Sequence, residues 1–246
     1  RNRIECVADN GVRLRIDWLT DNIIRFRYAS ENYFHKDFSY AIDPEFKTID
    51  LDLEVKEEDD WLVVSSLHLE VRISKENLCK TICDKSGKVL LNDENGFHWE
   101  KNYRSSNNIV KMTKDRREGE VYYGLGDKTA DFNLVGHRFE NWGSDCYGYD
   151  KGWDPLYKNI PFYYGLHDKI GYGLFFDNSF RTFFDFGKER HEVSSFWAHG
   201  GEMNYYFIGG PSLLDVAKRY ALLTGTHELP ALWTLGFQQC KWSYQP

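Results

Sequence analysis

Short stretches in which apolar and polar residues alternate recur along this chain, and they constrain its fold more than any other feature. Residues 67–73 alternate over their whole length, and residues 12–18 and 24–28 follow the same period of two. Such a period puts every second side chain on the same face of a β-strand. The connecting segments 167–170 and 178–180 are too short for the crossover helix that parallel strands require. The sequence therefore predicts a mainly β protein, an antiparallel β-sandwich.

One stretch carries helical periodicity instead. Residues 211–224 place apolar side chains three and four positions apart, with Pro211 expected in the first turn and Gly225 just after the last. Beyond this helix, the apolar run 233–237 is predicted to be an extended strand. A lone strand cannot cover both of its faces, so we expect further protein to pack against it.

Charge and motif content exclude several classes of protein. The net charge is -7, so nucleic acid is not an expected partner, because phosphate binding needs clustered Lys and Arg. No apolar run approaches the roughly 18 residues of a membrane span, so no membrane partner is expected. The sequence has no Cys-x-x-Cys or His-Glu-x-x-His motif, so neither a metal nor a cofactor is expected. Enzymes without cofactors and small-molecule-binding modules remain.

A series of motifs between residues 122 and 187 resembles a known enzyme family. Tyr-Tyr-Gly-Leu-Gly-Asp-Lys stands at 122–128, Phe-Glu-Asn-Trp-Gly-Ser-Asp-Cys-Tyr-Gly-Tyr at 139–149, and Phe-Asp-Phe-Gly at 184–187. Their order and spacing resemble the N-terminal domain of glycoside hydrolase family 31, the α-glucosidase and α-xylosidase group. The resemblance continues through residues 229–244. It implies a galactose-mutarotase-like sandwich followed by a (β/α)8 catalytic barrel.

The same resemblance implies a domain division and a function. We expect a sandwich domain at 1–225, with a linker and the first barrel strand at 226–246. The full-length protein is expected to be a glycoside hydrolase acting on α-linked glucosides or related α-glycosides. Its partners would be an oligosaccharide or α-glucoside substrate and the C-terminal barrel of its own chain. Glycoside hydrolysis normally needs two carboxyl groups, and neither catalytic motif of the family occurs in residues 1–246. We therefore assign no catalytic residue and expect this chain to be inactive alone.

Asp145 is the first candidate for contact with substrate. It lies in the polar and aromatic segment 141–149, which shows no strand alternation, and such loops often carry binding residues. The resemblance places it in a loop that reaches over the barrel mouth, where an Asp binds sugar hydroxyls. An ionised carboxylate can accept hydrogen bonds from two adjacent hydroxyls. The alternative is an Asp that closes a local Asx turn. Its neighbours Cys146 and Tyr147 are expected to line the same entrance.

Trp242 is the second candidate. It follows the strand expected at 233–237, and reacting groups of a β/α barrel lie at the C-terminal ends of its strands. The resemblance implies an aromatic side chain here, in the wall of the pocket that holds the cleaved sugar. A flat ring suits the C–H face of a pyranose. The alternative is a core tryptophan.

A second interpretation is a stand-alone carbohydrate-binding or mutarotase-like sandwich. The family's N-terminal domain shares that general fold, so fold alone does not separate the two interpretations. A mutarotase would need a His and a Glu that converge in a concave face. The apolar run 229–237 argues against a stand-alone module, since it would be exposed there.

Overall fold

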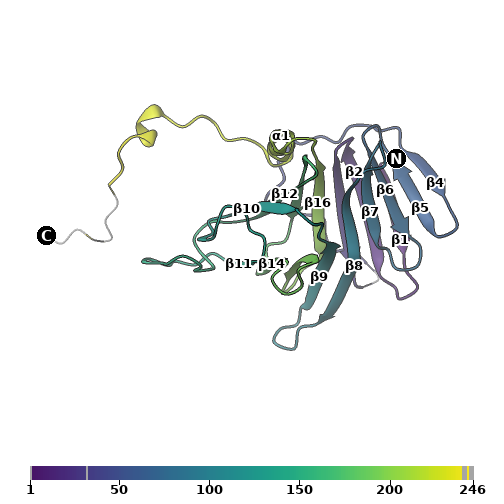
Figure 1. The fold of residues 1–246 in the computed structure, drawn as a ribbon, viewed down its shortest axis with the longest axis horizontal. Helices are drawn as coiled ribbons and strands as arrows, with labels where there is room; N and C mark the ends of the chain where they lie inside the picture. Colours follow the sequence, from purple (N-terminus) through teal and green to yellow (C-terminus); the bar gives the residue numbers. More distant parts are fainter. Residues whose placement is uncertain (1, 32, 240–242, 244–246) are drawn as a thin grey trace.

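The computed structural model describes residues 2–31, 33–239 and 243 as two packed antiparallel sheets with one α-helix (Figure 1). The seven-stranded sheet has the order β1 (Arg3–Val7), β2 (Arg13–Thr20), β3 (Ile23–Ala29), β16 (Met203–Gly209), β13 (Ile170–Phe176), β12 (Asn159–His167), β10 (Val121–Gly126). The nine-stranded sheet has the order β11 (Arg138–Asn141), β14 (Thr182–Phe186), β15 (Val193–Ala198), β9 (Asn108–Asp115), β8 (Val89–Lys101), β7 (Lys80–Asp84), β6 (Leu69–Ser74), β5 (Trp61–Ser65), β4 (Glu54–Glu57). The predicted mainly β, two-sheet antiparallel fold is confirmed.

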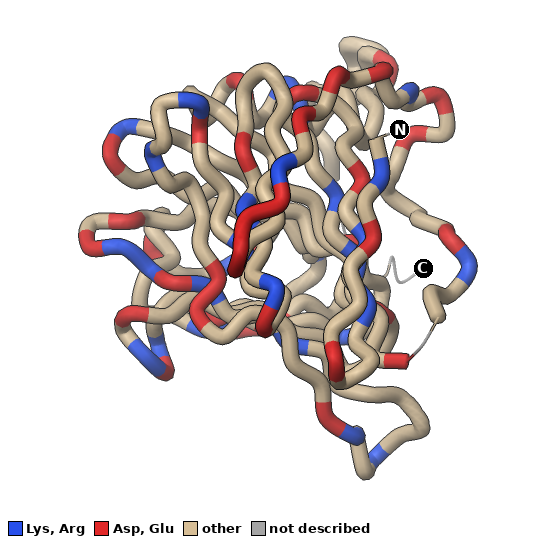
Figure 2. Tube along the Cα trace, turned by 90° about the vertical axis from the view of Figure 1, so that its right-hand side faces the viewer, with Lys and Arg blue, Asp and Glu red and all other residues tan. Residues whose placement is uncertain are grey.

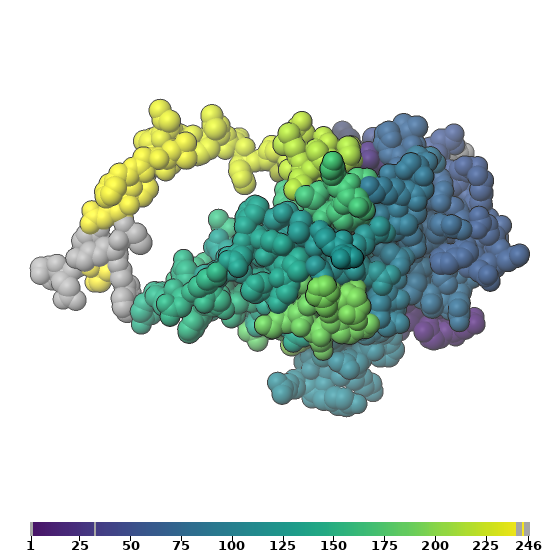
Figure 3. Space-filling view, viewed as in Figure 1, coloured from purple at the N-terminus to yellow at the C-terminus, as the bar shows by residue number. Residues whose placement is uncertain are grey.

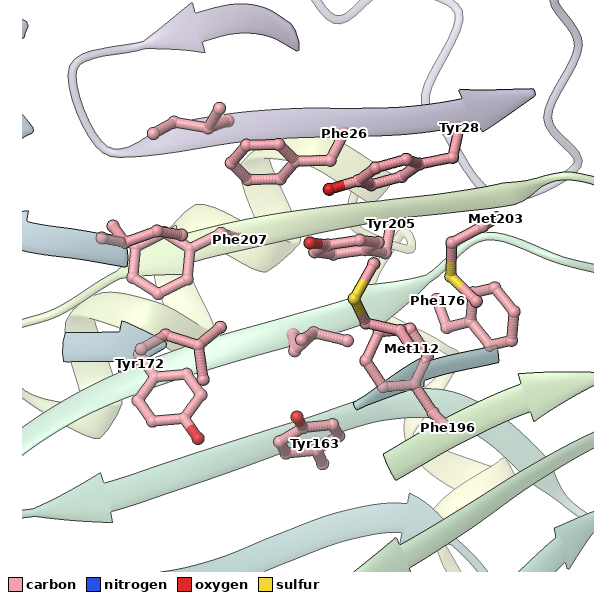
Figure 4. Packing of buried hydrophobic residues seen from close by; sticks show 14 of the residues in the cluster. Phe26, Tyr28, Met112, Tyr163, Tyr172, Phe176, Phe196, Met203, Tyr205 and Phe207 are labelled. Carbon is pink, nitrogen blue, oxygen red and sulfur yellow. The ribbon is translucent and has the colours of Figure 1, made fainter. Parts of the chain in front are cut away.

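An aromatic core fills the space between the sheets. The alternation predicted for β6 holds, with Leu69, Val71 and Ile73 buried and the residues between them more exposed. In the centre, the rings of Phe26 and Tyr205 stack with their centroids 5.3 Å apart (Figure 4). Burial of such rings removes large apolar areas from water, at roughly 25 cal/mol per Å². The core therefore depends on residues that are far apart in the sequence.

A cluster of charged side chains lies within this core. Asp93 and Lys80 have fully buried side chains, and the Lys80 Nζ–Asp93 Oδ2 distance is 2.7 Å. Lys114 Nζ also donates a hydrogen bond to Asp93, and the side chain of Lys114 is 1% exposed. The remaining donor capacity goes to tyrosine hydroxyls, from Lys80 to Tyr28 at 2.6 Å and from Lys114 to Tyr205 at 3.0 Å. Two ammonium groups thus share one buried carboxylate.

The helix α1 (Leu213–Thr224) covers the outer face of the seven-stranded sheet, against β13 and β16. Val216 and Leu223 pack there, and the ring of Tyr220 stacks on Phe162 at 4.0 Å. The helix begins at a capping box, in which the Ser212 side chain accepts a hydrogen bond from the Asp215 amide. Pro211 therefore precedes the cap, and its predicted place in the first turn is wrong. No described helix is long and apolar enough to cross a membrane.

The segment after α1 runs away from the sandwich (Figure 1). The strand predicted at 233–237 is absent, and Leu232–Leu235 form the single 3-10 turn η1. The physical reason is that a strand needs a neighbour for its backbone N–H and C=O groups, and no described strand pairs with this segment. The side chains of Leu232, Trp233 and Phe237 are consequently exposed.

Candidate functional site

The loop 142–158, between β11 and β12, projects from the sandwich and contains most of the residues predicted to meet substrate. Figure 3 shows this part of the chain (teal) as a protrusion on the same side of the view as the segment that follows α1 (yellow). Tyr147, Tyr149 and Trp153 are exposed on it, although they are large aromatic side chains. A long loop with exposed aromatic rings on a rigid scaffold is a typical binding element.

The Tyr-Gly-Leu-Gly motif at the end of β10 shapes the base of this loop. Gly124 and Gly126 both have positive φ, 126° and 82°, and the register against β12 shifts between them. A Cβ on Gly126 would lie 2.4 Å from the Lys158 carbonyl oxygen, and one on Gly124 would lie 2.7 Å from that of Phe162. Glycine is needed at both positions, because no L side chain fits the space or the backbone angle. The bulge carries the chain into Asp127 and Lys128.

Lys128 joins the two ends of the loop. Its Nζ donates to the Glu140 carbonyl at 2.7 Å, before the loop, and to Asp154 Oδ1 at 2.8 Å near its end. A third bond, 3.3 Å long, reaches Asn159 Oδ1 at the start of β12. The Lys128 side chain is 3% exposed, and burial lowers its pKa although the Asp154 charge opposes that effect. One buried ammonium group therefore holds both loop ends.

Further contacts fix the loop between these ends. Thr129 Oγ1 donates to the Trp153 carbonyl at 2.9 Å, and the Ser144 amide donates to the carbonyl of the buried Leu156 at 3.2 Å. At the entry, the Arg181 guanidinium lies 5.0 Å from the centre of the Trp142 ring. The same guanidinium pairs with Glu140 at 2.6 Å. The loop is thus attached at its base while its tip stays open to solvent.

Asp145 lies exposed on this loop. Among the described residues, neither of its side-chain oxygens accepts a hydrogen bond, so the Asx turn considered from the sequence does not form. The Tyr157 hydroxyl is close enough that desolvation and then the Asp145 charge raise its pKa. Cys146 is half-buried beside it, and Tyr147 is exposed. These three predicted residues are consecutive on the loop, and the fourth, Trp242, lies outside the described residues.

Sequence reasoning did not identify Lys128 or Arg181. Lys128 directly follows the Tyr-Gly-Leu-Gly-Asp motif, and this position beside a recognised motif was the only available signal. Arg181 meets Trp142 only because Asn141 pairs with Thr182 across β11 and β14. Neither partner could be assigned without the strand register.

A mutarotase would need an accessible histidine and glutamate, and the pair that lies beside Tyr172 in the core is closed to solvent. Glu120 accepts a hydrogen bond from the Tyr172 hydroxyl at 2.7 Å, and the His167 ring lies 6.2 Å from the Tyr172 ring. Glu120 is 2% exposed and His167 is 3% exposed, so a substrate cannot reach them. The described residues also contain no cluster of three potential metal ligands.

We expect Lys128→Met to loosen the loop. The change leaves the Asp154 carboxylate and the Glu140 carbonyl without their donor, a loss of about 1–3 kcal/mol for partly buried groups. Amides in 142–153 should then exchange with deuterium at least about tenfold faster, because local opening becomes that much less costly. Mass spectrometry of exchange in residues 1–246 measures this. Lys151→Met is the matched control, since Lys151 lies on the same loop and its pair with Asp131 is exposed. Equal exchange in the two variants would contradict the role given to Lys128.

The fold and the candidate site define a class of domain. It is a mainly β sandwich from which a polar and aromatic loop projects into solvent. The family described as "Glycosyl hydrolase 31 N-terminal galactose mutarotase-like domain" matches residues 13–185. The chain belongs to this family.

Curated relatives and solved structures agree with this membership. "Alpha-glucosidase 2" of Bacillus thermoamyloliquefaciens is 29% identical over 97% of this chain, which spans 29% of that protein. "Alpha-xylosidase XylQ" of Lactiplantibacillus pentosus is 31% identical over 78% of this chain, which spans 25% of that protein. The GH31 dextranase of Flavobacterium johnsoniae, solved with isomaltotriose, superimposes with a TM-score of 0.86 at 30% identity, over 96% of this chain and 28% of the dextranase. This chain therefore corresponds to less than a third of each.

Proposed function

We propose that residues 1–225 are the N-terminal domain of an α-glycosidase that hydrolyses α-linked glucosides or related α-glycosides. The observation that carries the proposal is the projecting loop with its exposed Asp145, in a chain of the glycoside hydrolase 31 family. Relatives named as an α-glucosidase, an α-xylosidase and a dextranase support an α-linked saccharide as the substrate. The sandwich supplies a wall of the substrate pocket, and the catalytic carboxylates belong to a barrel domain.

In this proposal the loop 142–158 closes over the barrel mouth. Asp145 accepts hydrogen bonds from two hydroxyls of one sugar, and Cys146 and Tyr147 line the entrance. The exposed position of Asp145 and Tyr147 supports this role. Trp242 is proposed as an aromatic wall of the same pocket. The flat ring would cover the C–H face of the sugar whose hydroxyls face the carboxylate.

We further propose that residues 226–246 are the linker and first strand of that barrel. The exposed Leu229, Leu232, Trp233 and Phe237 support a covering partner, because such a concentration of apolar side chains in solvent is unfavourable. Backbone pairing with a neighbouring barrel strand would satisfy the groups that the 3-10 turn leaves open. The segment would then become extended on joining the barrel.

Replacement of Asp145 in the longer protein that carries residues 1–246 tests this function. Asp145→Ala is expected to lower kcat/KM on α-linked disaccharides by roughly 10- to 100-fold, the range for losing charge-assisted hydrogen bonds of about 1.5–3 kcal/mol. Steady-state kinetics beside a thermal melt measures it. Asp150→Ala, exposed on the same loop, is the control. Unchanged kcat/KM in Asp145→Ala would make the loop a scaffold only.

A further inference from the structure

A separate cleft opens at the end of the sandwich where β3, β13 and β15 end and β9, β14 and β16 begin. Its volume is about 490 Å³, within the range of roughly 300–1,000 Å³ that is usual for small-molecule sites. Its sides come from segments that lie far apart in the sequence, namely 28–31, 33–38, 106–110, 177–180 and 201–204. None of the residues proposed to contact substrate lines it.

Two buried arginines form the floor of the cleft. Arg25 Nε donates to Asn204 Oδ1 at 2.8 Å, and its two Nη groups hold Asp37 at 2.9 and 2.7 Å. Arg27 Nε donates to Glu202 Oε2 at 2.9 Å, and Arg27 is only 2% exposed. These bonds fix planar polar groups before any ligand arrives, which lowers the entropic cost of binding.

One buried donor in the floor has no acceptor. Arg27 Nη1 makes no hydrogen bond to a described residue, and it lies 3.4 Å from Asp37 Oδ2, an ion contact without hydrogen-bond geometry. Leaving such a group unsatisfied costs about 1–3 kcal/mol. Native proteins satisfy most buried polar atoms, with protein, water or ligand. Because Nη1 is itself covered by protein, a ligand oxygen reaches it only if the lining side chains move.

Exposed aromatic rings form the walls. Tyr33, Phe38 and Phe180 line the cleft and are 56%, 63% and 42% exposed. The Phe180 ring lies on the backbone of Gly200 and Gly201, where an added Cβ would come within 2.5 and 3.1 Å of the ring. Glycine at positions 200 and 201 therefore leaves room for the exposed Phe180 ring. Flat apolar walls around polar groups suit a pyranose, with its C–H faces and equatorial hydroxyls.

The charge of the cleft selects a neutral ligand. Asp37 and Glu202 already pair with the two arginines, and the other charged lining groups, Lys36, Glu31 and Asp177, add no positive surplus. Residues of both signs are also interspersed over the chain as a whole (Figure 2). A phosphate or carboxylate ligand would have to displace these carboxylates, whereas hydroxyl groups need not.

We infer that this cleft is a second saccharide-binding site, which takes a neutral oligosaccharide. The inference rests on the proposed function for the sugar class, because an α-glycosidase meets such chains as substrate. Phe180 in the cleft wall directly precedes Arg181, which lies over Trp142 at the entry of the substrate loop. The cleft wall is thus one residue along the chain from a side chain that contacts the loop entry, and the cleft can hold a distant part of a chain whose end is cleaved elsewhere.

Calorimetric titration of residues 1–246 with isomaltotriose and with maltotriose tests this inference. We expect binding of at least one sugar with a dissociation constant on the order of 1 mM. Tyr33→Ala and Phe38→Ala should each weaken it roughly fivefold or more, as expected for loss of one stacking ring. Both rings are largely exposed, so the variants should keep the fold, and a thermal melt checks this. Tyr103→Ala, 96% exposed outside the cleft, is the matched control.

Asp145→Ala, titrated in parallel, separates the cleft from the loop. Binding that survives in Asp145→Ala and weakens in both ring variants supports the cleft. Binding lost in Asp145→Ala but retained in both ring variants assigns the sugar to the loop and overturns the inference, while leaving the proposed function standing. No binding of either sugar at about 50 mM also overturns it. The proposed function is judged independently, by the kinetics of the longer protein.

Discussion

Replacement of Asp93 by asparagine is expected to lower the free energy of unfolding by about 3–5 kcal/mol at pH 7, the usual result of removing one member of a buried ion pair. Asp93 is the only carboxylate that the structure gives to the two buried ammonium groups, those of Lys80 and Lys114, in the described core. Asparagine keeps the shape but not the charge. Two cations would then remain in the core without a counterion.

The wild-type cluster already carries one more positive charge than negative charge. Burial lowers the pKa of Lys80 to about 7, with the Lys114 charge adding to the effect and Asp93 opposing it. The pKa of Asp93 is lowered despite its burial, because Lys114 and Lys80 both stabilise its charged form. One carboxylate thus neutralises one lysine fully, and the other lysine loses its proton near neutral pH.

The pH dependence follows from these directions. In the unfolded chain Lys80 has a pKa of about 10.4. Between about pH 7 and pH 10 the unfolded chain therefore binds more protons at this residue than the folded chain does. Over this range Lys80 makes the free energy of unfolding rise with pH. In Asp93→Asn the carboxylate that opposes this lowering is gone, so the pKa of Lys80 should fall further. The difference in free energy of unfolding between Asp93→Asn and the wild type should therefore decrease as the pH rises from about 7 to 9.

Chemical denaturation at several pH values measures this prediction. Lys80→Met should lower the free energy of unfolding far less than Asp93→Asn does, because it leaves Lys114 and Asp93 as an ion pair with no net charge. Asp59→Asn, on the exposed turn between β4 and β5, should change stability by less than about 0.5 kcal/mol. A loss below about 1 kcal/mol in Asp93→Asn at pH 7 would show that the cluster is not held by charge.

Residues 1–246 by themselves are expected to show no glycosidase turnover. Glycoside hydrolysis depends on two carboxyl groups across the scissile bond, and neither catalytic motif of the family is in this sequence. The buried carboxylates described here have structural partners, as Asp185 has in Arg138 and in the Lys188 amide. Without the pair, nearly all of a rate enhancement that is typically ~10⁶-fold or more should be missing.

Aryl α-glucosides and α-xylosides are suitable substrates for this assay, with the longer protein as the positive control. Turnover by residues 1–246 that survives repeated purification, at rates near those of the longer protein, would mean that the active site lies within the sandwich. The cleft beside Arg27 and Glu202 would then be the first place to examine.

The architecture was largely predictable because strand signals are local. The period of two at 12–18 and 67–73 predicted β2 and β6, and helical spacing predicted α1. The strand predicted at 233–237 does not form in the described chain, for a related reason. Its apolar pattern is a local signal, but an extended segment also needs partners for its backbone, which the described chain does not supply.

The candidate site was predictable only in part. The motif resemblance indicated the loop and Asp145, and the structure adds how the loop is held, through Lys128, Asp154 and Arg181. These contacts link residues up to 41 positions apart, from Glu140 to Arg181. Their pairing depends on the register of β11 with β14 and on the bulge in β10. No local pattern contains that information.

The sequence by itself determined most of the strand and helix content, the family and the position of the loop that carries Asp145, because side-chain periodicity and short motifs are properties of neighbouring residues. Only the tertiary structure decided that Lys80 and Lys114 share Asp93 in the core, that Lys128 joins the loop ends, and that Arg25 and Arg27 form the floor of a cleft. Such groupings arise where strands distant in sequence are brought side by side. Burial then strengthens the electrostatic interactions between their charges, because water no longer screens them.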